Sequence, residues 1–366
     1  MTAVADSSRA GAVNLMDRAA WRSALATRRP VLAHLNADTT WLLQLPVPAS
    51  AAAPPRLRSK AKNAARCSHF NILIDPWLQG PQSDVASWFS TQWHVVEPAV
   101  QTVKELEEVL AEVGDGKASP GTTQIDCVAI SHEFTDHCHQ ATLTELPRGV
   151  PIVATEKAAD LIRSWGHFDT VITTPGFSTS TTDWHDALVD QTGTLPPWLG
   201  IGRVITEGNA LYYHSAVIIA FDLGYSTNQR ATRSRNSAPQ KQCEAVIYSP
   251  HGIKGSNLEC VRAAGIKTLA LLHGLDDIRI WMTAQLNLGA LNGIQAVRAS
   301  GAKYWVATHD EAKKGGGFIS WLLQRTTYSL RDAVEAEEAK AQGAEVNESP
   351  DYEFVELGSG DGLILT

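Results

Sequence analysis

Short apolar runs rich in β-branched residues alternate with longer segments of helical period along most of this chain. This alternation is typical of mixed β-sheets covered by helices, so we expect an α/β fold. The runs predict strands at Val31–Leu35, Thr40–Leu45, Phe70–Ile74, Ile125–Ile130, Ile152–Ala154, Gly202–Thr206, Ala210–Phe221, Ala245–Ser249, Thr268–Leu272 and Tyr304–Thr308. The helical periods predict helices at Thr102–Val113, Gln140–Leu146, Glu156–Trp165, Ser256–Ala263, Thr283–Ala299 and Phe318–Gln342.

The chain length permits one large domain or two ordinary ones, because 366 residues are about two to two-and-a-half times the usual domain unit. Two polar, breaker-rich and aperiodic stretches, residues 49–66 and 225–242, are typical of surface insertions. Neither is followed by a fresh, self-contained pattern. We therefore expect a single domain over residues 1–366 that carries these two insertions.

The charge balance argues against nucleic acid as a partner. The chain has 31 Lys and Arg against 39 Asp and Glu, a formal net charge of −8. It therefore lacks the overall basic field that drives binding to phosphate backbones. We expect a small-molecule substrate instead, and the oligomeric state stays open.

The expected location is the cytoplasm. No stretch reaches the roughly 18 apolar residues of a membrane-spanning helix, and the N-terminus lacks an apolar signal-peptide core. The five cysteines include no C-x-x-C pair and show no disulfide-framework spacing, which favours a reducing compartment. No membrane partner is expected.

One predicted strand, Ile125–Ile130, leads directly into a cluster of imidazoles and a carboxylate: His132, Asp136, His137 and His139. Strand ends in α/β proteins collect ligand-binding groups, because the sheet fixes the backbone while the next loop brings side chains to a shared point. Imidazole nitrogens with a carboxylate suit zinc, iron or manganese. The cluster therefore predicts a metal site, and a polar turn capped by Asp136 is the simpler alternative.

Three further histidines lie in or after predicted strands. His214 lies within the strand predicted to end at Phe221, while His251 and His309 each follow a strand. Each alone would more often be a buried core or turn histidine than a ligand. Together they supply the constellation that a metal site needs when its ligands come from distant parts of a sheet.

The segment His132-Glu-Phe-Thr-Asp136-His137 resembles the H-x-H-x-D-H signature of the metallo-β-lactamase superfamily, in the degenerate form H-x-F-x-D-H. The later histidines follow in the order and spacing of that family's later metal motifs. The resemblance covers nearly the whole chain. It implies an αββα sandwich, two mixed sheets flanked by helices, with the site at one edge between the sheets.

Other segments resemble the lactonase-like branch of that superfamily, which includes ascorbate-6-phosphate lactonase. An early strand ends in Asp75-Pro-Trp, and Gly80-Pro and Trp88-Phe-Ser follow it. A helix, Thr283–Ala299, and the strand that ends at His309 are also similar to that branch. The resemblance implies that Asp75 orients a ligand or hydroxide, whereas an Asp-Pro at a strand end is also a common turn starter.

Two positions depart from the family pattern. Phe134 stands where the signature has its second histidine, and Pro250-His251 stands where the family usually has an Asp that bridges two metals. A neutral imidazole binds one metal through one nitrogen, so we predict one divalent ion, preferably zinc and otherwise manganese or iron(II), at the second of the two family positions. Its expected ligands are Asp136, His137 and His309 with His251 added, while His132 and His214 would remain from the first position.

The ligand set and the resemblance imply a metal-dependent hydrolase of a small ester, lactone, thioester or phosphodiester. A cation with an open coordination position makes hydroxide available at neutral pH and polarises a substrate oxygen. Asp136, His132 and His214 are the candidate catalytic residues. Two alternatives stay open: a catalytically silent binding protein of the same fold, and a mononuclear iron redox enzyme, since two His and a carboxylate also suit Fe(II).

Further residues are candidates for orienting ligands or lining the pocket: Asp75, Glu133, His139, His94 and His273. Each has an ordinary structural alternative, such as facing solvent or packing a loop. Lys313-Lys314 followed by Gly315-Gly-Gly317 lacks the phosphate-loop pattern G-x-x-x-x-G-K-[ST], so this stretch predicts a hinge or turn.

Overall fold

Two mixed β-sheets contain most of the strands in the structure, a computed structural model that describes residues 11–51, 68–84, 86–114, 123–181, 183–205, 212–226, 243–280, 284–340 and 351–366. Of the two expected insertions, residues 52–66 and 227–242 lie outside the described residues, so the prediction of insertions there stays a prediction. Within the described ranges, no helix has the length and apolar character needed to cross a bilayer.

The first sheet has eight strands, of which β4, β6, β7 and β8 run parallel and the others pair antiparallel. In spatial order its strands are β1 (Ala12–Asn14), β20 (Asp361–Ile364), β2 (Val31–His34), β3 (Trp41–Pro46), β4 (His69–Ile74), β6 (Cys127–Ile130), β7 (Ile152–Ala154) and β8 (Val171–Thr173).

The second sheet has seven strands; β12, β13, β16 and β19 run parallel, and β9 pairs parallel with β10 at the other edge. In spatial order its strands are β19 (Glu353–Val355), β16 (Tyr304–Val306), β13 (Ile266–His273), β12 (Cys243–Ser249), β11 (Ala216–Phe221), β10 (Leu199–Val204) and β9 (Gly176–Phe177). Smaller sheets join β15 (Ala284–Asn287), β14 (Asp276–Ile280) and β18 (Leu323–Thr327), and pair β17 (Lys314–Gly316) with β5 (Thr91–Trp93).

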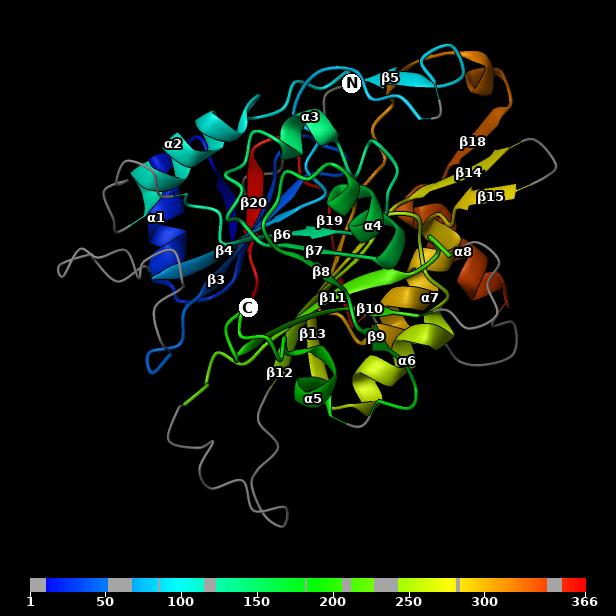
Figure 1. The fold of residues 1–366 in the computed structure, drawn as a ribbon. Coiled ribbons are helices and arrows are strands. Elements are labelled where there is room, and N and C mark those ends of the chain that lie inside the picture. The colour runs from blue at the N-terminus through cyan, green and yellow to red at the C-terminus, as the bar shows by residue number, and fades with distance from the viewer. Residues whose placement is uncertain are drawn as a thin grey trace.

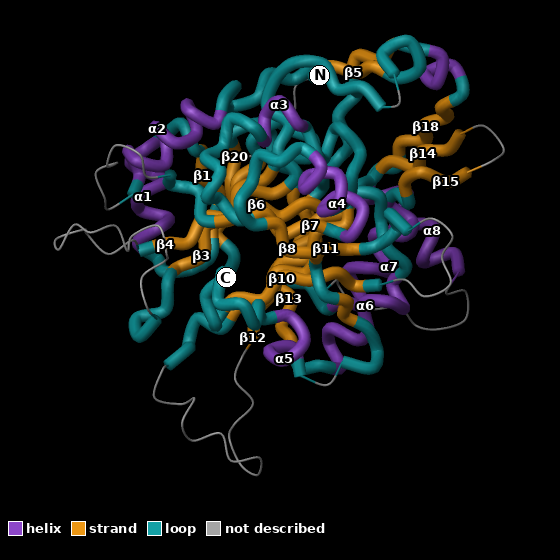
Figure 2. Tube along the Cα trace, in the orientation of Figure 1, coloured by secondary structure: helices purple, strands orange, loops and turns teal. Residues whose placement is uncertain are grey.

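Side-chain alternation along the strands divides the core into three layers. In β3, Trp41, Leu43 and Leu45 face the second sheet, while Leu42 faces the helices on the other side. The middle layer is therefore made by both sheets, and each outer layer by one sheet and its helices. Figure 2 shows the strands at the centre and the helices at the flanks.

Helices cover the outer face of each sheet, as Figure 1 shows for α1 and α2 on one side and α6, α7 and α8 on the other. Those on the eight-stranded sheet are α1 (Arg18–Ala26), α2 (Val103–Val113), α3 (Gln140–Leu143) and α4 (Glu156–Ser164). Those on the seven-stranded sheet are α5 (Trp184–Leu188), α6 (Gly255–Ala263), α7 (Ala290–Ser300) and α8 (Leu330–Lys340). The predicted fold class, two mixed sheets flanked by helices, is confirmed.

Helix α2 illustrates how the sequence fixes these elements. Thr102 caps its N-terminus, because the hydroxyl accepts a hydrogen bond from Glu105 N at 3.1 Å. Val103, Leu106 and Leu110 are buried at helical spacing, so one stripe of the helix packs against the sheet.

Two predicted helices are wrong in part. The expected helix Thr283–Ala299 begins only at Ala290, because the strand β15 precedes it and pairs with β14. Gly289 separates the two: a Cβ there would lie 2.4 Å from Leu275 O, so this backbone is pressed against β14. The expected helix Phe318–Gln342 contains a 3-10 turn (Phe318–Trp321) and β18 before α8, because β18 gains a sheet partner in β14.

Candidate metal centre

The candidate site lies where the parallel strands of both sheets end. Asp75 follows β4, His132 follows β6, His251 follows β12 and His309 follows β16. Because β4 and β6 are parallel, and β12 is joined to β16 through the parallel β13, each set of carboxyl ends meets at one edge. This edge is the place that the sequence predicted for the site.

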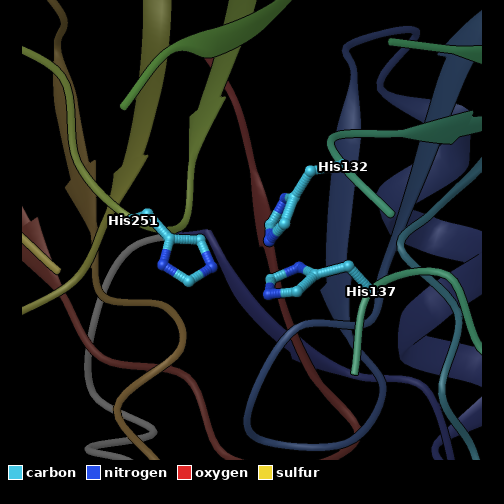
Figure 3. A group of neighbouring side chains, drawn as sticks. All are labelled: His132, His137 and His251. Carbon is cyan, nitrogen blue, oxygen red and sulfur yellow. The ribbon is translucent and has the colours of Figure 1, made fainter. Parts of the chain in front are cut away.

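Three imidazoles, those of His132, His137 and His251, converge at this edge. One ring nitrogen from each lies within 4.8 Å of the others, and all three side chains are buried. Figure 3 shows the three rings turned toward a common point. Within the described part of the chain, the Nε2 atom of each ring has no hydrogen-bond partner. Three buried, unpaired nitrogens aimed at one point form an arrangement that a bound cation would satisfy.

The opposite nitrogen, Nδ1, is held in each of the three rings. His137 Nδ1 donates to Asp75 Oδ2 at 2.7 Å, and His251 Nδ1 donates to Asn287 Oδ1 at 2.8 Å. His132 Nδ1 lies 2.7 Å from Ser131 Oγ, whose own hydrogen is donated to Asp75. Each Nδ1 therefore carries a proton, which leaves the lone pair of the neutral ring on Nε2.

Asp75 is the residue that organises this side of the site. Its Oδ1 accepts a hydrogen bond from Ser131 N at 2.8 Å, while Oδ2 accepts from Ser131 Oγ and from His137. The side chain is completely buried and its backbone φ is +42°, a left-handed conformation that side chains other than Gly, Asn and Asp seldom adopt. His309 has a φ of +60°, so two site residues hold strained backbone.

A glycine shapes the turn that presents His251. Gly252 has a φ of +81°, and a Cβ there would lie 2.6 Å from Leu288 Cβ. Leu288 N donates to His251 O at 3.0 Å, so the segment between β15 and α7 packs tightly against this turn. The turn therefore needs a residue without a side chain directly after the histidine.

Burial and neighbouring charges set the protonation of the three imidazoles. Burial lowers the pKa of His132 and of His251 well below the ordinary value, and the neighbouring imidazoles lower it further. Burial also acts to lower the pKa of His137, but the carboxylates of Asp136 and Asp75 outweigh it and raise that pKa. His132 and His251 are thus neutral at neutral pH, as a metal ligand must be.

A second group, Asp136, His137 and His309, shares His137 with the first. One ligand atom from each again lies within 4.8 Å of the others. Asp136 Oδ1 is 3.6 Å from His137 Nε2, and Asp136 Oδ2 is 3.8 Å from His309 Nε2. His309 Nδ1 lies 3.1 Å from Asp38 Oδ1, which orients the ring.

Lys313 reaches into this second group. Its Nζ lies 2.8 Å from Asp136 Oδ2 and 2.8 Å from Asp38 Oδ2. Burial acts to lower the pKa of Lys313, but the two carboxylates outweigh it and raise the pKa above its ordinary value. The same ion pairs hold the pKa of Asp136 and of Asp38 below the usual range despite burial. The group therefore contains a permanent cation between two carboxylates.

The turn between β2 and β3 fastens the loops of the two sheets together. Asn36 Oδ1 accepts from Asp38 N and Thr40 N at 3.0 and 2.9 Å, which closes the turn. Thr39 Oγ1 donates to Asp136 O at 2.8 Å, and His309 N donates to Asp38 O at 2.9 Å. The spacing between ligands from different sheets is thereby fixed.

His214 lies outside both groups of ligands. It precedes β11 rather than lying within a strand, and its Nε2 donates to Leu286 O at 2.9 Å. The sequence placed His132 with His214, and His251 with Asp136; the geometry instead places His251 with His132 and His137. The turn at Gly252 and the partner Asn287 give His251 this position.

Phe134, at the position of the missing signature histidine, packs against the ligands. Its ring centroid is 4.9 Å from that of His132 and 5.9 Å from that of His251, and Tyr213 lies next to it at 5.6 Å. The aromatic ring therefore covers His132 and His251 on this side. His251 supplies the third nitrogen that Phe134 lacks.

The other predicted pocket residues have structural partners. Glu133 accepts a hydrogen bond from Tyr212 Oη, and His139 caps α3 through Thr142. His273 pairs with Gly274 O and Asn292 Oδ1 at 2.8 and 2.9 Å and lies behind the His251 turn.

His94 belongs to a loop at the rim of the site. Its Nδ1 lies 2.7 Å from Glu311 Oε2, and its ring stacks on Trp77 with centroids 3.7 Å apart. It also lines a cavity of about 280 Å³ together with Trp93 and Glu97. The loop that carries Lys313 is thus attached to the loop that carries His94.

Sequence reasoning missed several residues that build the site. Asp38 lies in a turn without any motif, and Lys313 precedes the glycines that predicted only a hinge. Asn287 fell in a segment expected to be helical. No local pattern marks these residues, because each acts through a contact with a distant part of the chain.

The chemistry of the donors fits a divalent metal ion. Three imidazoles with a free coordination position are a ligand set of catalytic zinc, and they also suit iron(II). The buried unpaired Nε2 atoms and the protonated Nδ1 atoms both match this use.

The solved structures that this chain resembles include two hydrolases and a metallo-beta-lactamase fold protein. The isothiocyanate hydrolase from Delia radicum gut bacteria is 13% identical, with 91% of this chain and 98% of that chain covered and a TM-score of 0.48. Igni18, a metallo hydrolase from Ignicoccus hospitalis KIN4/I, is 10% identical, with 91% of this chain and 97% of that chain covered and a TM-score of 0.46. The metallo-beta-lactamase fold protein YhfI from Bacillus subtilis is 11% identical, with 91% of this chain and 98% of that chain covered and a TM-score of 0.41.

No protein-family model and no curated protein matches this sequence. The structural similarities lie at low identity and below a TM-score of 0.5, so the chemistry of the site rests on the residues of this chain. Those residues form a buried cluster that could hold a metal ion, in which three imidazole nitrogens from both sheets face one point.

Proposed function

We propose that this protein is a metal-dependent hydrolase that works with one divalent ion, preferably zinc, held by His132, His137 and His251. The observation that carries the proposal is the set of three buried Nε2 atoms without hydrogen-bond partners among the described residues. The substrate we propose is a small ester, lactone, thioester or phosphodiester. The resemblance of Asp75-Pro-Trp to the lactonase-like branch favours a lactone among these.

A divalent ion with an open coordination position lowers the pKa of a water molecule to near 7 and polarises a carbonyl or phosphoryl oxygen. The residues around the three imidazoles exclude bulk water, since all three side chains are buried and Phe134 covers those of His132 and His251. A dry site strengthens every electrostatic interaction with the developing charge of the reaction.

Asp136 and His309 are the side chains that we assign to proton handling. Asp136 Oδ1 lies 3.6 Å from His137 Nε2, so this carboxylate would be placed to accept a hydrogen bond from a water molecule at the ion. His309 is oriented by Asp38 in the manner of a histidine whose Nδ1 is held by a carboxylate, so its Nε2 is the atom that exchanges a proton with the leaving group. This assignment replaces the role that the sequence suggested for His214.

Metal analysis and a substrate panel test the proposal together. Protein purified without chelators is expected to contain a divalent metal and to hydrolyse at least one of a nitrophenyl ester, a lactone, a thioester and a phosphodiester. The variant His137→Ala is expected to lose both properties, since His137 belongs to both ligand groups. The matched control His167→Ala changes a histidine that bonds Leu146 O outside the site and should retain both.

Two results would contradict the proposal. Protein that binds no zinc, manganese or iron under any supplementation cannot use these imidazoles as ligands. Protein that binds metal and hydrolyses no member of the panel would instead favour a binding protein. A ferrous protein that consumes oxygen would favour the redox alternative.

A further inference from the structure

Lys313 occupies a position that an ion would take in a site for two metals. Its Nζ lies 2.8 Å from Asp136 Oδ2, and this oxygen is 3.8 Å from His309 Nε2. His137 belongs to both groups, and its one unpaired nitrogen can bind only one ion. With the first ion bound there, Asp136 and His309 would remain to hold a second ion, together with the Asp38 carboxylate that contacts Lys313. The ammonium is thus in contact with one of the atoms that a metal ion in this group would bind.

The surroundings hold the ammonium in place. Asp38 Oδ2 lies 2.8 Å from Nζ. The ammonium also lies over the ring of Trp77, 5.4 Å from its centroid, which is a cation–π contact. The side chain of Lys313 is 10% exposed, and those of Asp38 and Asp136 are 0% and 11% exposed. Burial of this kind requires a charge to be paired, and here the pairing is mutual.

The backbone that carries Lys313 is fixed from two directions. Glu311 accepts hydrogen bonds from Val95 N and Val96 N at 2.6 and 2.7 Å, while Arg325 Nη1 donates to Glu311 O at 2.9 Å. Directly after Lys313, β17 pairs with β5. The ammonium is therefore held between the two carboxylates in the ligand-free protein.

A charge count separates the two groups of ligands. The second group and its neighbour Asp38 present two carboxylates, and Lys313 already neutralises one of these charges. A divalent ion there would have to displace the ammonium or lie beside a like charge. The three-imidazole group has no cation of its own within the described residues, and its nitrogens are unpaired.

We propose that the Lys313 ammonium takes the place of a second metal ion, so that this side chain determines the metal stoichiometry of the centre. The proposal rests on the proposed function only in that a first ion binds to His132, His137 and His251. Lys313 acts as a positioning residue: it holds Asp136 and Asp38 in the orientation that a second cation would otherwise impose.

Metal titration of matched variants tests the role of Lys313. Full-length protein, Lys313→Met and the control Lys314→Met are stripped of metal, loaded with Mn²⁺ and analysed for bound metal after gel filtration. The unchanged protein and Lys314→Met, whose side chain is exposed on β17, are expected to bind about one equivalent. Lys313→Met, which removes the charge and keeps an unbranched side chain one atom shorter, is expected to bind about two equivalents.

Electron paramagnetic resonance gives a readout that does not depend on activity. A single Mn²⁺ gives the spectrum of an isolated ion, whereas two ions at the roughly 4 Å separation of a two-metal site couple magnetically. The coupled spectrum is expected only for Lys313→Met. The double variant Asp38→Asn with Lys313→Met removes one of the carboxylates left unpaired and serves if the single variant does not fold.

The outcomes separate this inference from the proposed function. If the unchanged protein binds two ions, or both Lys313 variants bind one, the role of Lys313 is overturned while the hydrolase proposal stands. If no variant binds metal at all, the metal-dependent function itself fails. Two coupled ions in the Lys313 variants and one in both controls would support the inference.

Discussion

The two groups of ligands share His137 but differ in how their polar atoms are satisfied. In the first, with His132 and His251, the Nε2 atoms are buried and lack partners among the described residues. In the second, with Asp136 and His309, an ammonium already contacts the carboxylate. Similar distances between ligand atoms therefore do not imply similar affinity for a metal ion. The Lys313 ammonium, which already contacts the second group, determines that the first group binds a metal ion more tightly.

Removal of His251 gives the largest expected effect on this contrast. His251→Ala leaves two imidazoles in the first group and an ammonium in the second, so the affinity for Zn²⁺ should fall by more than about 100-fold. Competition with a chromophoric chelator measures the change. His214→Ala serves as the control because His214 lies outside both groups. An equal loss in the two variants would show that His214 is a ligand and contradict the assignment.

Lys313→Met breaks the contrast by removing the ammonium from the second group. Without metal, the variant leaves Asp38 and Asp136 buried and uncompensated, so its free energy of unfolding should fall by about 3–5 kcal/mol. Urea unfolding in the presence of a chelator measures this loss, and added Mn²⁺ should restore most of it. Lys314→Met should change the value by less than about 0.5 kcal/mol. A metal-free Lys313 variant as stable as the unchanged protein would mean that the ion pairs contribute little.

Asp75→Asn sharpens the contrast by weakening the support of the first group: that of His137 directly and that of His132 through Ser131. Asparagine tolerates a positive φ and keeps the shape of the side chain, so the backbone at +42° should survive. It removes the charge that holds His137 Nδ1, and metal affinity should fall about 10- to 100-fold. The chelator competition used for His251 applies here. Unchanged affinity would show that Asp75 serves the fold and not the ligand.

The smallest expected effect is the pH dependence of metal uptake. Asp136 and Asp75 raise the pKa of His137, so in the metal-free protein a proton competes for this ligand as pH falls. His132 and His251 have lowered pKa values and compete only at lower pH.

Affinity for Zn²⁺ should therefore fall by at most about tenfold per pH unit as the pH drops below the raised pKa of His137, because one proton-linked ligand is lost. Chelator competition at several pH values gives this slope. Asp75→Asn should move the onset to lower pH, because it removes one of the charges that raise the pKa. A slope corresponding to two or more protons would contradict the assignment of the neutral forms.

Much of the fold could be predicted from the sequence, because hydrophobic alternation and helical periodicity are local. Helix α2 and the strand at Ile152–Ala154 match their expected ranges closely. Strands β15 and β18 were missed: β15 pairs with the nearby β14 within a segment of helical period, and β18 pairs with β14 from far along the chain. A segment that can form either helix or strand follows the partner that the fold provides.

The site divides in the same way. His132, Asp136 and His137 form a dense cluster after a strand and could be named from the sequence. The association of His251 with them could not, because it depends on a turn at Gly252 and on Asn287. Lys313 is the extreme case: its neighbours in sequence suggest only a turn, and its charge acquires meaning from Asp38, hundreds of residues earlier.

The three imidazoles come from both halves of the sandwich, with His132 and His137 after β6 of one sheet and His251 after β12 of the other. A bound ion would therefore cross-link the two sheets at the edge where their loops meet. The free energy of ion binding would be lost whenever either sheet unfolds, which couples the two halves into one cooperative unfolding unit. Chelation should then lower the melting temperature of the whole molecule.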